Sequence, residues 1–132
     1  MMTSYVAGRR ILRLLAAILI AAVAACSSLR RAPDPGHAYI IFHNNSLTQA
    51  DVFIVPQGAG ARRIGTVMAG QTDTLSVGPD ITGRGTLSIV ARLLARSQAP
   101  QTGPVSIYPG ETYEVRLPSD GRILSFLPAR GD

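Results

Sequence analysis

The chain has 132 residues, of which 46% are hydrophobic, 16% charged and 5% aromatic. This length excludes a large multidomain enzyme and leaves room for one small globular domain with a short appendage. The 13 glycines and 9 prolines supply turns for an all-β protein, but they are too few for collagen or for a disordered chain. Length and composition therefore narrow the architecture without indicating an activity.

The net charge of +5 comes from the N-terminal segment alone. Five arginines precede residue 32 without any acidic residue, whereas arginines and acidic residues balance in the remainder. The chain also contains no lysine and no tryptophan. Nucleic-acid binding draws its affinity from clustered cations, so we expect no nucleic-acid partner for a neutral body.

The first residues have the organisation of a secretory signal, with Arg9 and Arg10 in a polar start and an apolar stretch from Leu14 to Ala25. As a helix, that stretch would span about 18 Å, which is too short to cross roughly 30 Å of hydrocarbon. It suits the apolar part of an export signal. We therefore expect residues 1–25 to be a signal peptide.

The tetrapeptide Val23-Ala24-Ala25-Cys26 resembles the lipobox of bacterial lipoproteins, and Cys26 is the only cysteine. The resemblance implies cleavage between Ala25 and Cys26 and a diacylglyceryl group on the Cys26 sulfur. A thiolate suits this step because it is a good soft nucleophile, and two or three acyl chains give stable attachment. Two alternatives stay open, an uncleaved anchor helix over 11–29 and an ordinary thiol at Cys26.

Residues 26–36 form the lipidated cysteine and a proline-rich tether, which has no apolar periodicity. Ser27 follows the cysteine at a position where aspartate, by analogy with enterobacterial sorting, would favour inner-membrane retention. We therefore expect the protein in the cell envelope, lipid-anchored on the periplasmic or extracellular side of a membrane, with the outer membrane favoured.

Residues 37–130 show an apolar period near two, broken about every eight to twelve residues by turn-forming residues, which is typical of a β-sandwich or barrel. The first two apolar runs are nearly continuous, so we expect central strands covered on both faces. Thr86–Leu94 also fits a helix face, but its neighbours favour a strand. The expected strands are Ala38–His43, Asp51–Val55, Arg63–Met68, Thr72–Val77, Thr86–Leu94, Val105–Tyr108, Tyr113–Leu117 and Arg122–Leu127.

Residues 107–115 resemble the tyrosine corner of fibronectin type III and other Greek-key sandwiches, with Tyr113 as the structural tyrosine. The resemblance implies an all-β, seven- to eight-stranded, immunoglobulin-like (Greek-key) β-sandwich, preceded here by the N-terminal signal or anchor helix. It also implies that the Tyr113 hydroxyl bonds to backbone a few residues upstream. Because the chain has no second cysteine, packing alone must stabilise this body.

Residues with catalytic chemistry are few. His37 and His43 are the only histidines, and neither belongs to a zinc or hydrolase motif. The Gly58–Gly60 segment lacks the third glycine of a dinucleotide loop and indicates a hairpin turn. Arg62 and Arg63 could receive an acidic partner or discourage edge pairing. We expect most aromatic rings to face the core, namely Tyr39, Phe42, Phe53, Tyr108, Tyr113 and Phe126.

The sequence thus assigns no catalytic, cofactor-binding or metal-binding residue and no small-molecule substrate. Our hypothesis is a non-catalytic, lipid-anchored envelope protein that acts as a structural or protein-interaction module. It would be an accessory subunit of a membrane-associated assembly and would bind an envelope protein. The alternative is a small carbohydrate- or metal-binding module, or a hydrolase, on the same anchor.

Overall fold

The structure is a computed structural model that describes residues 34–129. The expected signal peptide over 1–25, Cys26 and most of the tether lie outside the described residues. Between residues 34 and 129 the chain forms eight strands. No helix within this range is long and apolar enough to span a membrane.

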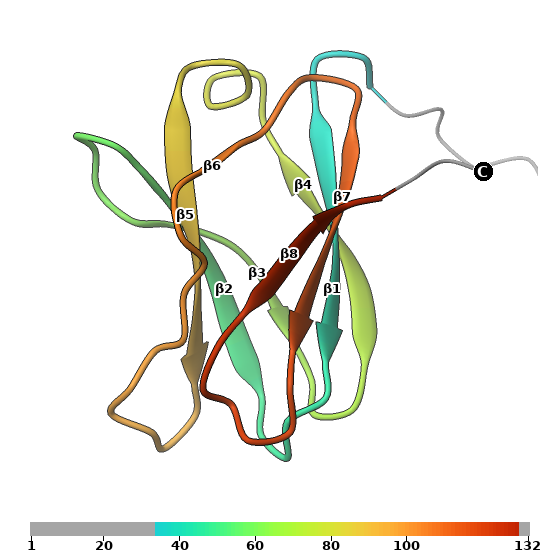
Figure 1. The fold of residues 1–132 in the computed structure, drawn as a ribbon. Coiled ribbons are helices and arrows are strands. Elements are labelled where there is room, and N and C mark those ends of the chain that lie inside the picture. Colours follow the sequence, from blue (N-terminus) through green and yellow to red (C-terminus); the bar gives the residue numbers. More distant parts are fainter. Residues whose placement is uncertain (1–33, 130–132) are drawn as a thin grey trace, which may run out of the picture. The chain divides into compact units, whose positions relative to one another are not determined.

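The eight strands form two packed four-stranded sheets, so the expected all-β sandwich is confirmed (Figure 1). One sheet has the order β4-β1-β7-β8 and the other the order β3-β2-β5-β6. Neighbouring strands are antiparallel except β1 and β7, which are parallel. The strands are β1 Ala38–Asn44, β2 Ala50–Pro56, β3 Arg62–Val67, β4 Thr72–Val77, β5 Thr86–Leu93, β6 Val105–Ser106, β7 Thr112–Leu117 and β8 Ser125–Pro128.

Every expected strand is present in the expected order, and the ambiguous segment after residue 85 is a strand. The expectation for β6 was too long, because only two residues pair there, and β8 begins at Ser125 and not at Arg122. The chain before β6 lies along β5 through Thr102, whose hydroxyl accepts a 3.0 Å hydrogen bond from the Ile89 N–H. Residues 107 and 108 do not continue β6, because the Ile107 oxygen accepts from the Gly83 N–H and the Tyr108 N–H donates to the Tyr113 hydroxyl.

The core lies between the two sheets and is built by alternation. Along β1 and the first five residues of β2, buried residues alternate with partly exposed ones. The expectation that these strands are covered on both faces is therefore wrong, because Ile41 and Phe53 point outward and remain partly exposed. The largest inward side chains include Ile40, Phe42, Ile54, Ile89, Leu93, Ile107 and Leu117.

The strand order does not reproduce that of an immunoglobulin constant domain, in which the first two strands share a sheet. Here β1 and β2 lie in different sheets, and β1 lies between β4 and β7. The immunoglobulin-like assignment stays a prediction that rests on the motif around Tyr113.

The register directs the loops to two ends of the sandwich (Figure 1). The near end consists of residues 34–37, 57–61, 78–85 and 107–111, and the described chain begins there. The far end, at the bottom of Figure 1, consists of residues 45–49, 68–71, 94–99 and 118–124. These two ends carry the features that bear on function.

Candidate functional site

Four large apolar side chains are exposed at the far end, one on each of its four loops. The exposed fractions are 87% for Leu47, 57% for Met68, 65% for Leu94 and 69% for Ile123. Isolated exposed apolar residues are ordinary on protein surfaces, but several on adjoining loops are typical of an interaction site. The far end is therefore the candidate contact surface of this domain.

The side chain of Asn44 holds two of these loops in place. It is fully buried, and its Nδ2 donates to the backbone oxygens of Thr48, Val67 and Met68 at 2.9, 3.0 and 3.1 Å. Its Oδ1 accepts hydrogen bonds from the backbone N–H and the hydroxyl of Ser46 at 3.1 and 2.6 Å. One amide thus joins the loop after β1 to the turn after β3.

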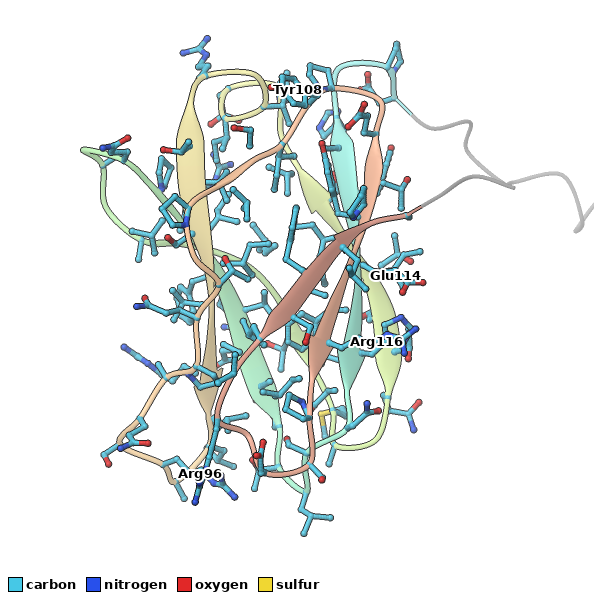
Figure 2. The ribbon with its side chains drawn as sticks, viewed as in Figure 1. Arg96, Tyr108, Glu114 and Arg116 are labelled. Atoms are coloured by element: carbon cyan, nitrogen blue, oxygen red, sulfur yellow. The ribbon has the colours of Figure 1, made fainter. Side chains whose placement is uncertain are left out.

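The other two far-end loops are also joined. Arg96 Nη1 donates to the Asp120 backbone oxygen at 2.9 Å, and Figure 2 shows Arg96 at this end. The Leu94 N–H donates to the Gln49 oxygen at 3.0 Å. Gly121 has a φ of +64°, a conformation that favours glycine. Because these loops are already fixed, a partner would bind with little loss of loop entropy.

A polar row lies on the outer face of the β4-β1-β7-β8 sheet. His43 Nδ1 is 2.9 Å from Thr72 Oγ1, and His43 Nε2 is 3.9 Å from Glu114 Oε1. Arg116, beside Glu114 on β7 in Figure 2, donates to Glu114 Oε2 at 3.1 Å. A hydrolase built on His43 would also need hydrogen-bond donors aimed at the carbonyl group of its substrate. The backbone N–H groups of β1 and β7 are engaged within the sheet rather than available for this role, because each of these strands has a neighbour on both sides.

The two histidines do not meet. His37 precedes β1 and its Nδ1 is 3.1 Å from Asp34 Oδ2, whereas His43 lies near the other end of the same strand. Within residues 34–129, no group of three or more histidine, cysteine, aspartate or glutamate side chains could hold a metal ion.

The arginine pair at the start of β3 is already matched by acidic residues of the same domain. Arg62 forms an ion pair with Asp80, and Arg63 Nη2 is 3.0 Å from Asp51 Oδ1. The suggestion that these two arginines receive an acidic partner therefore loses support. As exposed pairs they contribute little to stability.

Only part of the expectation for the aromatic rings is confirmed. Phe42 and Tyr113 are in the core, and Phe126 packs against it. In contrast, Tyr108 is 55% exposed. Tyr39 and Phe53 occupy outward positions, where the Arg92 guanidinium lies 5.5 Å from the centroid of the Phe53 ring.

Tyr113 begins the inward row of β7, and its hydroxyl is engaged on both sides. It accepts from the Tyr108 N–H and donates to a Glu111 carboxylate oxygen. Burial, followed by the hydrogen bond to Glu111, raises the pKa of Tyr113 from 10.0 to about 12. This tyrosine is therefore a neutral structural group, and its identification as a tyrosine corner stays a prediction.

The far-end residues carry little signal in the sequence. Met68, Leu94 and Ile123 fall within expected strands, and Leu47 is a single apolar residue in an expected turn. The predicted lipidation residue Cys26 and the predicted cleavage site between Ala25 and Cys26 lie outside the described range. Comparison of the chain with protein-family models and with curated proteins finds no match.

Proposed function

We propose that this protein is a non-catalytic, lipid-anchored envelope protein whose far end binds another envelope protein. It would act as an accessory subunit of a membrane-associated assembly. The observation that carries this proposal is the set of four exposed apolar side chains on loops that are fixed by hydrogen bonds. The anchor rests on the motif ending in Cys26, and Ser27 favours the outer membrane.

The lengths involved favour a protein partner over the anchoring membrane. From Cys26 to Asp34 the chain can extend at most about 28 Å. The seven residues of β1 alone span about 23 Å between the two ends of the sandwich. Bringing the far end to the bilayer would therefore require a nearly fully extended tether. A less extended tether could not reach the near end while the far end faced the bilayer.

The surface also indicates the chemistry of the partner. Arg96 and Arg122 are exposed among the apolar side chains, against one acidic residue, Asp120. A complementary surface would offer apolar pockets with acidic groups at the rim, because opposite charges at a rim guide association.

The contact surface is tested by purifying the tagged protein from detergent-solubilised envelopes. The variant carrying Leu47→Ser and Ile123→Ser should lose a partner that the unchanged protein retains in stoichiometric amount. Leu127→Ser is the control, because Leu127 is 53% exposed on β8 and lies outside the far end. Retention of the same partner by the double variant, or equal loss in the control, would contradict the proposal.

The anchor is tested separately by Cys26→Ser. The substitution should abolish incorporation of labelled fatty acid and release the body from the membrane fraction. Incorporation that persists would remove Cys26 as the lipidation site. Loss of incorporation with unchanged membrane retention would favour the uncleaved anchor helix over 11–29.

A further inference from the structure

A cavity of about 320 Å³ opens at the near end, between the β2–β3 loop and the β4–β5 loop. Its apolar lining includes Pro56, Ile81 and Leu87, and its charged lining consists of Arg62, Asp80 and Arg84. This size falls at the lower end of the range for small-molecule sites, which combine apolar walls with a few polar groups.

The walls of this cavity are held by contacts within the domain. The ion pair of Arg62 and Asp80 joins the start of β3 to the β4–β5 loop. The Gln57 N–H donates to the Thr86 oxygen at 3.0 Å, which fixes the β2–β3 loop against β5. The cavity therefore exists before any ligand binds.

The charge of the lining favours an anion. Asp80 is engaged by Arg62, and no carboxylate of residues 34–129 lies within salt-bridge distance of Arg84. Among the described residues, the Arg84 charge therefore has no carboxylate partner and lies beside apolar walls. A Cβ added at Gly60 or Gly85 would meet nothing within 4 Å, so the space next to these walls is open.

We propose that this cavity binds a small anionic amphiphile, with a phosphate or carboxylate head at Arg84 and a short apolar chain against Ile81 and Leu87. A guanidinium binds either head group through charge-assisted hydrogen bonds. Membrane lipids and soluble metabolites both offer this chemistry. The site is separate from the far end and does not depend on the proposed partner.

The test is a calorimetric titration of the full chain, held in phosphatidylcholine nanodiscs, with hexyl phosphate. Saturable binding of one molecule per chain is expected, and hexanol and methyl phosphate should each bind more weakly. Arg84→Gln should weaken binding of hexyl phosphate about tenfold, through loss of a charged hydrogen bond. Gly60→Leu should also weaken it, because Gly60 lines the cavity and has open space around it that a larger side chain can fill.

The matched control is Arg122→Gln at the far end, which should leave the affinity unchanged. Circular dichroism establishes that each variant is folded. Absence of saturable binding, or equal affinity in Arg84→Gln, Gly60→Leu and the unchanged chain, would overturn the proposal. Replacing part of the phosphatidylcholine with phosphatidylglycerol identifies the source of the ligand. If phosphatidylglycerol competes with hexyl phosphate, the ligand is a membrane lipid. If the binding of hexyl phosphate is unchanged, the ligand is a soluble molecule.

Discussion

The backbone N–H of Tyr108 donates a 3.0 Å hydrogen bond to the hydroxyl of Tyr113, which in turn donates to Glu111 Oε2 at 2.5 Å. The ring of Tyr113 also stacks on that of Phe126, with 5.1 Å between centroids. These contacts join the start of β7 to the loop before it and to β8.

Removing this hydroxyl should destabilise the domain. We expect Tyr113→Phe to lower the free energy of unfolding by about 1–2 kcal/mol, because the Tyr108 N–H and the Glu111 carboxylate each lose a partly buried hydrogen bond. Tyr39→Phe is the control, since the Tyr39 hydroxyl accepts a 3.0 Å hydrogen bond from the Asp34 N–H at an exposed site. Its effect should stay within about 0.5 kcal/mol. Urea unfolding measures both, and equal effects would refute the distinction.

The raised pKa of the Tyr113 hydroxyl predicts that the domain loses stability at alkaline pH. Burial, and then the hydrogen bond to Glu111, raise the pKa of Tyr113 from 10.0 to about 12. A raised folded-state pKa gives stability that is fully present below pH 10 and is lost as the pH rises through about 12. The unchanged protein should lose on the order of 2 kcal/mol more than Tyr113→Phe across this window. Urea unfolding measures both proteins across this window. Equal losses of unfolding free energy in the two would rule this out.

Replacing Asn44 should destabilise the domain far more than replacing its neighbour Asn45. Asn44→Ala removes the five hydrogen bonds of a fully buried side chain, including a buried bond to the Val67 oxygen, so we expect a loss of about 2–4 kcal/mol in unfolding free energy. Asn45→Ala changes an exposed side chain and should cost less than about 0.5 kcal/mol. Thermal unfolding of both variants tests this, and a mild effect at Asn44 would show that other contacts fix these loops.

Gly65 permits the close approach of β3 and β4. A Cβ at this position would lie 2.5 Å from Leu75 Cδ2, and Leu75 belongs to the core. Gly65→Ala should therefore cost about 1–3 kcal/mol. Adding Leu75→Val removes the clashing atom, so the double variant should be more stable than the sum of the single losses predicts.

Gly103→Ala is the control for this pair, because a Cβ at Gly103 would meet nothing within 4 Å. Denaturant unfolding of all four variants completes the cycle. Strict additivity of the two single losses would show that Gly65 and Leu75 do not interact in this way.

The strands could be predicted because alternation is a local property. In β7 the inward residues Tyr113, Val115 and Leu117 alternate with outward ones, and this pattern alone defines the strand. The pairing of β1 with β7 could not be predicted, because it joins residues as distant in sequence as Ile40 and Tyr113. The length of β6 was also missed, since the bond from the Gly83 N–H to the Ile107 oxygen depends on a tertiary contact.

The candidate contact surface at the far end could not be predicted from the sequence either, because it combines residues that are distant in the chain. Leu47 and Ile123 are far apart in the sequence, and Ile123 was expected within a strand. Only the fold places both on loops at one end of the sandwich. Asn44 could be expected to lie at a turn, but the oxygens that its amide binds beyond β3 could not be inferred from alternation. The cavity beside Arg84 likewise combines the β2–β3 hairpin with the loop that connects β4 to β5 in the other sheet, and the two segments have no common motif.

The central claim is that acyl chains on one sulfur hold this β-sandwich at a membrane. Intact-mass analysis of the protein purified from its native envelope tests this most directly. The account predicts a chain that begins at Cys26 and carries the added mass of a diacylglyceryl group. A chain that begins at Met1, with Cys26 as a free thiol, would contradict it.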